Sequence, residues 1–252
     1  MPSPLPEPDP NWALFLDFDG TLAEIAPTPD SVAVNGRLPA LLARLQRALQ
    51  GAVVIVSGRP LDQIDRYLAP TRLRAAGLHG WQMRAAVDAE PALPETPEGL
   101  GRIRSALRAF ADKTDGIRLE DKGVSLALHF RAAPDRGPDC RAAAERAAAS
   151  ANDYEVLDGK MVVEVKPAAC DKGKAIETFL AEPGFAGRTP IFAGDDRTDE
   201  HGFETVNRLG GISIRVGGAR PTAAQHRIET VDAFRDWLDK VADGLDKDND
   251  KA

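Results

Sequence analysis

The chain has 252 residues, of which 43% are hydrophobic and 28% are charged, as is typical of a globular protein with a sizeable core. Its net charge of −7 argues against nucleic acid or an anionic membrane as the main partner. No signal peptide is recognised in the proline-rich start, and no apolar run approaches the about 20 residues that a membrane helix needs. The two cysteines match no metal or redox spacing. We therefore expect a cytoplasmic protein without a nucleic-acid or membrane partner.

At both ends of the chain, short apolar runs alternate with amphipathic helical patterns. The expected strands are ALFLDF (13–18), AVVIVSG (52–58), residues 75–78, TPIFAGDD (189–196) and GGISIRVG (210–217). The expected helices cover residues 38–49, 60–68 and 231–241. Strands that alternate with helices in this way indicate a parallel sheet covered on both faces.

The middle of the chain has a different pattern, in which pairs of adjacent strands each follow a helical segment. The strand pairs are GIRLEDKG with VSLALHFR and DYEVLDGK with MVVEVKP, and the helical segments are 102–113 and 139–150. Strands joined by short turns indicate an antiparallel sheet in an α+β domain. We predict a Rossmann-like α/β core in two parts, 1–81 and 171–242, with an α+β cap inserted at 82–170. The charged tail, 243–252, is predicted to be disordered.

Four polar clusters fall at the edge of the predicted sheet where open α/β folds bind ligands. They are DFDGT (17–21), SGR (57–59), DKGKA (171–175) and GDDRTDE (194–200). Carboxylates from separate loops suit Mg²⁺, and we expect Asp17 and Asp195 as ligands, with Asp19 contributing its backbone carbonyl. Asp196 or Asp199 would be a further ligand or a support. A calcium loop starting at Asp17 is excluded, because its sixth and twelfth positions lack the required glycine and glutamate.

The residues beside these carboxylates indicate phosphoryl transfer. A lysine, Lys172, and a hydroxyl, Ser57, supply positive charge and a hydrogen-bond donor for an anionic phosphoryl group. A carboxylate can attack phosphorus and form an aspartyl-phosphate. Asp17 is placed for that attack, and Asp19, two residues further on, can protonate the leaving oxygen. A purely structural reading of SGR, with Ser57 capping the next helix, stays open.

The motifs also carry a resemblance. DFDGTL, SGR, the lysine of DKGKA and GDDRTDE, in that order, resemble the signature motifs of the haloacid dehalogenase superfamily, one class of which carries an α/β cap between the second and third motifs. GLHGW (77–81), DKGVSLALHFR (121–131) and GKMVVEVKP (159–167) together with GDDRTDE resemble trehalose-6-phosphate phosphatases. The resemblance extends from about residue 13 to residue 216. Trp81 departs from the family pattern after GLHG, which leaves the local packing open.

The resemblance implies a Mg²⁺-dependent phosphatase that releases trehalose and phosphate from trehalose 6-phosphate. It makes Asp17 the nucleophile and a metal ligand, and Asp19 the general acid and base. Lys172 would act with them as the third catalytic residue by neutralising the phosphoryl group. Phosphate binding is implied for Thr21, Ser57 and Gly58, and metal binding for Asp17, Asp19, Asp195 and Asp196. Substrate binding is implied for Arg59, Lys122, His129, Lys160, Glu164 and Lys166.

Several alternatives stay open at this point. The same chemistry could serve another sugar phosphate, such as sucrose 6-phosphate or a glycosyl-phosphoglycerate. The chain could also be a catalytically silent module that senses a sugar phosphate, although the intact set of Asp17, Asp19, Lys172 and Asp195 argues against this. A trehalose-6-phosphate synthase of the same pathway is a candidate partner. The charged cap residues could equally form the solvated face of a half-exposed sheet, and His129 could be structural.

Overall fold

The computed structural model describes residues 5–26, 31–34, 36–218 and 221–249. The chain forms two compact units, which are described separately. The core unit comprises Met1–Ala92, Lys172–Asp195 and Asp199–Ala252, and the inserted unit comprises Leu93–Asp171 and Asp196–Thr198. The core unit continues past the predicted boundary at residue 81, because the strand that follows this boundary pairs with the core sheet.

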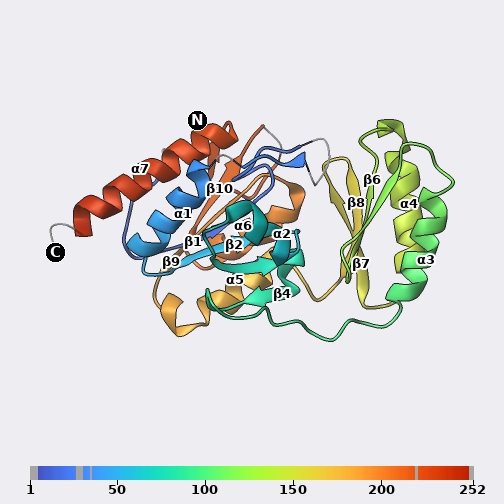
Figure 1. The fold of residues 1–252 in the computed structure, drawn as a ribbon, viewed down its shortest axis with the longest axis horizontal. Helices are drawn as coiled ribbons and strands as arrows, with labels where there is room; N and C mark the ends of the chain where they lie inside the picture. The colour runs from blue at the N-terminus through green and yellow to red at the C-terminus, as the bar shows by residue number, and fades with distance from the viewer. Residues whose placement is uncertain (1–4, 27–30, 35, 219–220, 250–252) are drawn as a thin grey trace. The chain divides into compact units, whose positions relative to one another are not determined.

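Within the described residues, the core unit contains a seven-stranded sheet with the order β11-β10-β9-β1-β2-β3-β4 (Figure 1). Its strands are β1 (Trp12–Leu16), β2 (Val53–Val56), β3 (Arg74–Gly77), β4 (Gln82–Arg84), β9 (Thr189–Gly194), β10 (Ile212–Val216) and β11 (His226–Ile228). Neighbouring strands run parallel except for β3 and β4, which are antiparallel. Every residue of β1 and β2 is buried, as expected for central strands covered on both faces.

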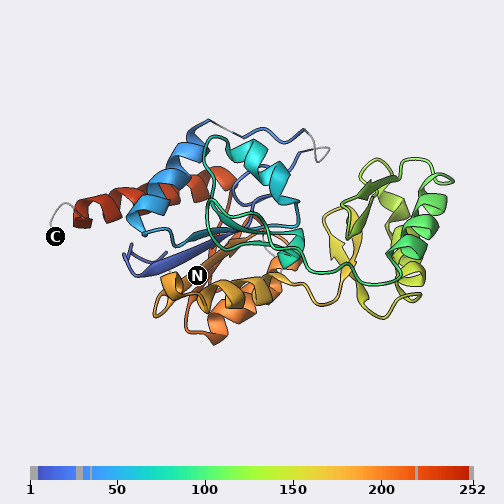
Figure 2. The same cartoon turned by 60° about the horizontal axis from the view of Figure 1, so that its bottom comes forward.

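Helices cover both faces of this sheet, as predicted. They are α1 (Arg37–Ala48), α2 (Leu61–Leu68), α5 (Lys172–Leu180), α6 (Glu200–Arg208) and α7 (Val231–Asn249). The pair α1 and α7 lies side by side on one face, and the pair α5 and α6 lies on the other (Figure 2). In α1 the buried leucines Leu38, Leu41, Leu42 and Leu45 have the spacing of one helix face, which explains why this segment is helical and how it packs. No helix in the described ranges has the length and apolar character needed to span a membrane.

The end of α7 corrects the prediction of a disordered tail at 243–252. The helix continues to Asn249, and Leu245 is only 1% exposed. Arg44 pairs with both Asp243, at 2.6 Å, and Asp246, at 2.5 Å. The charged composition of this segment concealed an amphipathic continuation of the helix, whose single apolar position faces the core. Residues 250–252 of the predicted tail lie outside the described part of the chain.

The inserted unit contains a four-stranded antiparallel sheet with the order β5-β6-β8-β7. Its elements are α3 (Leu100–Ala111), β5 (Arg118–Asp121), β6 (Leu126–His129), α4 (Gly137–Ala148), β7 (Tyr154–Gly159) and β8 (Val162–Pro167). Short 3-10 helices lie at Leu78–Gly80 (η2) and Pro183–Phe185 (η4) in the core unit, at Pro134–Arg136 (η3) in the inserted unit, and at Arg197–Asp199 (η5). The predicted strand pairs are confirmed. Ile103, Leu107, Leu128 and Val163 share one hydrophobic core, so α3 and α4 pack on one face of the sheet.

The strand order determines where a site can form in the core unit. From β1 the chain winds through β2 to β3 on one side, and β9, β10 and β11 follow on the other side. The direction of winding therefore changes at β1, and β9 is its parallel neighbour there, with Leu16 paired to Ala193. Ligands of open α/β sheets bind beyond the carboxyl ends of strands at such a switch point.

Candidate active site

A carboxylate cluster lies at the switch point of the core sheet. Asp17 directly follows β1, Asp195 directly follows β9, and Asp199 ends the η5 turn before α6. Carboxylate oxygens of these three residues all lie within 4.8 Å of one another. The parallel ladder explains the meeting of the first two, because the backbone N–H of Asp17 donates to the carbonyl of Ala193 at 3.0 Å and so aligns the two strand ends.

Lys172, the first residue of α5, neutralises part of this cluster. Its Nζ donates to Asp17 Oδ1 and to Asp199 Oδ1, both at 2.6 Å, and its side chain is only 3% exposed. The second oxygen of Asp199 accepts a hydrogen bond from the backbone N–H of Asp195 at 2.9 Å. Lys172 and Asp199 therefore join the nucleophile candidate to the loop that carries Asp195.

The pKa values reflect this buried network. The pKa of Asp17 is raised to about 7, chiefly by burial and also by the charge of Asp199, while the pairing with Lys172 opposes the rise. Burial alone lowers the pKa of Lys172, but the charges of Asp17 and Asp199 outweigh burial and raise it. The lysine therefore stays charged. Three carboxylates surround this one lysine, and a divalent cation would compensate the excess negative charge that they carry when ionised.

The loop after β1 lies close against Asp195. Gly20 has a φ of +82°, and a Cβ on it would lie 2.1 Å from Asp195 Oδ2, so only glycine permits this approach. The hydroxyl of Thr21 is buried, and within the described residues it is the buried side-chain polar atom without a hydrogen-bond partner. Buried polar atoms are nearly always paired, so this hydroxyl points to a bound polar ligand. The oxygen-rich donor set and this hydroxyl fit Mg²⁺ with a phosphoryl group.

Asp19 has a different environment from Asp17. Its two oxygens accept hydrogen bonds from Arg59, one from Nε at 2.6 Å and one from Nη2 at 2.7 Å. The guanidinium of Arg59 also lies 5.2 Å from the ring centre of Tyr67 and donates to Gln63 at 3.0 Å. Asp19 is 35% exposed in its side chain and stands outside the carboxylate cluster. Two aspartates in such different surroundings suit two different roles.

The predicted substrate residue Arg59 is thus held against Asp19, and the predicted phosphate residues lie next to it. Ser57 is buried at the end of β2, and its hydroxyl accepts a hydrogen bond from the backbone N–H of Arg59 at 3.1 Å. A Cβ on Gly58 would lie 2.7 Å from the ring of His79. The backbone N–H of His79, at a φ of +58°, donates to the Ser57 carbonyl at 2.9 Å. His79, which the sequence showed only as part of GLHGW, therefore packs against the loop that carries Ser57 and Gly58.

In the inserted unit, several predicted substrate residues share one face of the sheet. Glu120, Ala127 and Glu164 are paired across β5, β6 and β8, and side chains two residues apart on a strand point the same way. Glu164 accepts hydrogen bonds from Lys122 at 3.0 Å and from Ser125 at 2.7 Å. This face is opposite the one that packs on α3 and α4.

A second pair on this face joins His129 and Glu120 at 2.7 Å. Burial raises the pKa of Glu120, but the hydrogen bond with His129 and the charge of Lys122 outweigh burial and lower it. Lys166 is buried and bonded to Glu155 at 2.5 Å and to the carbonyl of Cys170. This predicted substrate residue is therefore engaged in contacts within its own unit.

Asp196 and Lys160 are in contact with each other. The backbone N–H of Lys160 donates to Asp196 Oδ2 at 3.1 Å, and residues Asp196–Thr198 group with the inserted unit. Of the two residues that the sequence offered as a further ligand or support, Asp199 lies in the carboxylate cluster of the described residues, and Asp196 does not. Asp199 packs closely on the end of β9, because a Cβ on Gly194 would lie 2.3 Å from its carboxyl carbon.

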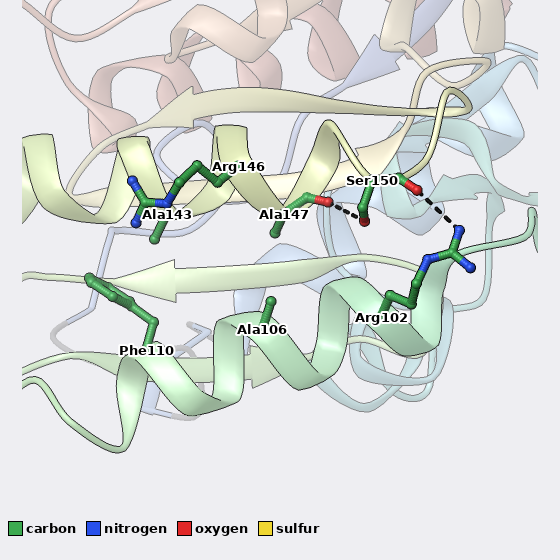
Figure 3. A pocket seen from close by; sticks show the side chains of 7 residues that line it. All are labelled: Arg102, Ala106, Phe110, Ala143, Arg146, Ala147 and Ser150. Carbon is green, nitrogen blue, oxygen red and sulfur yellow. Dashed lines mark hydrogen bonds between the residues drawn. The ribbon is translucent and has the colours of Figure 1, made fainter.

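A groove in the inserted unit lies away from these residues (Figure 3). It has a volume of about 320 Å³ between α3 and α4 and is lined by Arg102, Ala106, Phe110, Ala143, Arg146, Ala147 and Ser150. None of the predicted site residues lines it, and Arg102 spans its edge by donating to the carbonyl of Ser150 at 3.0 Å. Its lining offers no carboxylate, and its one hydroxyl, that of Ser150, donates to the carbonyl of Ala147 at 2.7 Å, so we place the chemistry at the core cluster.

The parallel sheet, with acidic residues at its switch point and a buried lysine beside them, forms a site suited to phosphoryl transfer. The chain shares its fold with a solved sugar phosphatase of the haloacid dehalogenase superfamily, with a TM-score of 0.59 at 14% identity, covering 94% of this chain and 99% of that one. The family model described as trehalose-phosphatase matches residues 15–242, and the chain belongs to this family. It is therefore a phosphoric monoester hydrolase.

Known proteins agree with this assignment over nearly the whole chain. A probable trehalose-phosphate phosphatase of Sinorhizobium fredii is 45% identical over 234 residues, which cover 92% of this chain and 88% of the relative. The trehalose-6-phosphate phosphatase of Escherichia coli K12 is 38% identical over 241 residues, covering 95% and 90%. A solved structure described as a trehalose-6-phosphate phosphatase related protein has a TM-score of 0.77 at 28% identity, covering 93% and 99%.

Proposed function

We propose that this enzyme hydrolyses trehalose 6-phosphate to trehalose and inorganic phosphate, with Mg²⁺ as cofactor and an aspartyl-phosphate on Asp17 as intermediate. The observation that carries the chemistry is the buried Asp17, held by Lys172 within reach of Asp195 and Asp199. The observation that supports the substrate is the family match over residues 15–242. Asp17 and Asp195 would hold the cation, which supplies positive charge against the phosphoryl oxygens when bound.

In the first step, a carboxylate oxygen of Asp17 attacks phosphorus. The bond from phosphorus to the sugar oxygen breaks, and the leaving oxygen takes a proton from Asp19. Lys172, the hydroxyls of Thr21 and Ser57, and the backbone amide of Gly58 stabilise the charge on the phosphoryl oxygens. Arg59 keeps the Asp19 carboxyl in one orientation through its two hydrogen bonds.

In the second step, Asp19 accepts a proton from a water molecule, and the water oxygen attacks phosphorus. The bond between phosphorus and the Asp17 oxygen breaks, so that inorganic phosphate leaves and the free carboxylate returns. Asp19 is again protonated and ready for the next cycle. Its partial exposure suits this exchange with water, whereas the burial of Asp17 protects the intermediate.

We propose that the polar face of the inserted sheet binds the sugar hydroxyls. Glu164 and Glu120 are acceptors already oriented by Lys122, Ser125 and His129. Carboxylates fixed in this way can accept hydrogen bonds from hydroxyls, and a ligand lacking those hydroxyls leaves them poorly paired. Lys160 would contribute from the turn at the margin of this face, whereas Lys166, which is buried and bonded to Glu155, would support the sheet.

We also propose that the enzyme is cytoplasmic, because Cys140 and Cys170 are buried and form no disulfide with each other, as in a reducing compartment. The substrate would come from a trehalose-6-phosphate synthase, an enzyme that transfers a glycosyl group and leaves the phosphate on the sugar.

The deciding experiment measures phosphate release with Mg²⁺ from trehalose 6-phosphate, sucrose 6-phosphate, glucose 6-phosphate and a glycosyl-phosphoglycerate. We expect kcat/KM to favour trehalose 6-phosphate by roughly 100-fold or more, since specificity here comes from hydrogen bonds to hydroxyls. If another compound of this panel is preferred, the roles of Asp17 and Asp19 stand and the proposed substrate is wrong. If no phosphate is released from any of the four but trehalose 6-phosphate binds, the chain is instead a sensing module.

A further inference from the structure

Arg215 is a buried charge outside every motif that the sequence singled out. It lies within β10, whose other residues are Ile212, Ser213, Ile214 and Val216, and it is only 2% exposed. In the sheet it pairs with Gly194, the residue immediately before Asp195. Burying a guanidinium is unfavourable unless it is hydrogen-bonded, so its partners indicate why an arginine stands here.

Its main partner is the backbone of the carboxylate cluster. Nη2 of Arg215 donates to the carbonyl of Asp195 at 2.5 Å, and Nη1 lies 3.3 Å from Glu200 Oε1. The N–H of Asp195 donates to Asp199 Oδ2 at 2.9 Å. The backbone of Asp195 is therefore held at its N–H by a carboxylate and at its carbonyl by a guanidinium.

Glu200 is fixed in turn. Its other oxygen, Oε2, accepts hydrogen bonds from the backbone N–H of Ala223 at 2.8 Å and from the hydroxyl of Thr222 at 3.2 Å. Arg215 thus stands between a braced carboxylate and the loop of Asp195. The two contacts use two different nitrogens of one planar guanidinium group. A lysine could not make both contacts with this geometry.

We propose that Arg215 is a positioning residue for the metal site, which fixes the backbone of Asp195 so that its carboxylate faces Asp17. The inference rests on the proposed role of Asp195 as a Mg²⁺ ligand. Groups that orient a ligand without touching the metal typically change metal affinity by about 10–100-fold when they are removed. Arg215 does not reach the reacting atoms, so its loss should weaken metal binding more than it slows the chemistry.

The neighbouring strand offers a matched control. Arg227 on β11 pairs with Arg215 in the sheet register. Its Nε donates to the carbonyl of Gly217 at 2.9 Å, and its Nη2 lies 3.0 Å from Glu229. It makes the same kinds of contact, one to a carbonyl and one to a carboxylate, without touching Asp195.

The test compares Arg215→Met, Arg215→Lys and Arg227→Met with the wild type. Binding of Mn²⁺ to the metal-free proteins, a probe for carboxylate sites that take Mg²⁺, is followed by loss of the free-ion paramagnetic resonance signal. We expect the Kd for Mn²⁺ to rise by about 10–100-fold in Arg215→Met, to rise less in Arg215→Lys, and to stay near wild type in Arg227→Met. The Mg²⁺ concentration for half-maximal phosphate release should rise in parallel, with kcat at saturating Mg²⁺ little changed.

A folded Arg215→Met protein with the wild-type Kd for Mn²⁺ would overturn the inference. If Arg215→Met does not fold, the decision passes to Arg215→Lys, and a wild-type Kd in that variant overturns it equally. An equal rise of the Kd in Arg227→Met would contradict the inference, because the loss of any arginine from this part of the sheet would then have the same effect. A wild type that binds no Mn²⁺ and releases phosphate in excess EDTA would instead refute the proposed metal role, and the inference with it.

Discussion

The charged residues of the core unit and those of the inserted unit are paired in different ways. At the core switch point, Lys172 bonds to partners 155 and 27 residues away, and all three side chains are nearly inaccessible. On the inserted sheet, Glu120 pairs with His129 on the adjacent strand, and Glu164 pairs with Lys122 in the turn between β5 and β6. The core ions are fixed at strand ends by the fold itself, which suits covalent chemistry. The inserted ions lie along a sheet face, which suits recognition of many hydroxyls. Burial at a strand end, more than charge alone, therefore distinguishes the chemical site.

The largest expected effect comes from the core. Asp17→Asn removes the attacking oxygen and should lower kcat by at least about 10⁴-fold, as for other nucleophile deletions. The fold should persist, because the substitution removes one of three clustered carboxylates and relieves repulsion. Steady-state phosphate release gives the activity, and thermal unfolding gives the stability. Near-normal turnover would refute the assigned mechanism.

The next effect combines stability and rate. Lys172→Met leaves Asp17 and Asp199 buried without their cation, which should cost about 3–5 kcal/mol of unfolding free energy. The loss of a charge that stabilises the phosphoryl group should lower kcat by about 10²–10³-fold. Urea unfolding and phosphate release measure the two quantities. Lys174→Met, at an exposed position on the same helix, is the control and should change neither. An unchanged urea midpoint for Lys172→Met would contradict the buried ion network.

A smaller and selective effect is expected in the inserted unit. Glu164→Gln should lower kcat/KM for trehalose 6-phosphate by about 10–100-fold, because a charged hydrogen-bond acceptor is worth about 1.5–3 kcal/mol. Hydrolysis of p-nitrophenyl phosphate, which has no sugar hydroxyls, should stay unchanged. Glu145→Gln on α4, whose partner is Arg141, is the control on the opposite face. An equal loss of kcat/KM with both substrates would mean that Glu164 supports the fold and does not recognise the sugar.

The smallest effect is a difference in the sign of pH dependence between the two regions, measured on metal-free protein. The pKa of Asp17 is raised to about 7, so its contribution to stability is present at acidic pH and is lost as pH rises toward 7. The pKa of Glu120 is lowered from 4.5, so its contribution is present above 4.5 and is lost as pH falls below it. Relative to wild type, Asp17→Asn should therefore gain stability as pH rises, and Glu120→Gln should gain it as pH falls. Urea unfolding from pH 4 to pH 8 checks both, and slopes of the same sign would contradict the two environments.

Much of this organisation was predictable. An apolar run that ends in an acid, as in LFLD before Phe18, predicts both a buried strand and a polar residue at its carboxyl end. The same reasoning brought Asp17 and Asp195 to one edge of the sheet. Composition misled at 243–249, where a high density of charge concealed one buried apolar position, Leu245. Charge content reports solvent exposure on average, and a helix needs only one apolar face to pack.

Local patterns along the chain were sufficient to predict the central strands, the parallel core, the antiparallel insertion and the residue types at the strand ends. The short edge strands β4 and β11 were not predicted. Only the tertiary structure decided which charges share a partner. Arg59 meets Asp19, Lys172 meets Asp199, and Arg215 meets the backbone of Asp195. Each contact depends on strand order and register, which bring residues that are distant in the chain within 3 Å. Hydrogen bonds and buried ion pairs act only over such distances, so no pattern of neighbouring residues can reveal them.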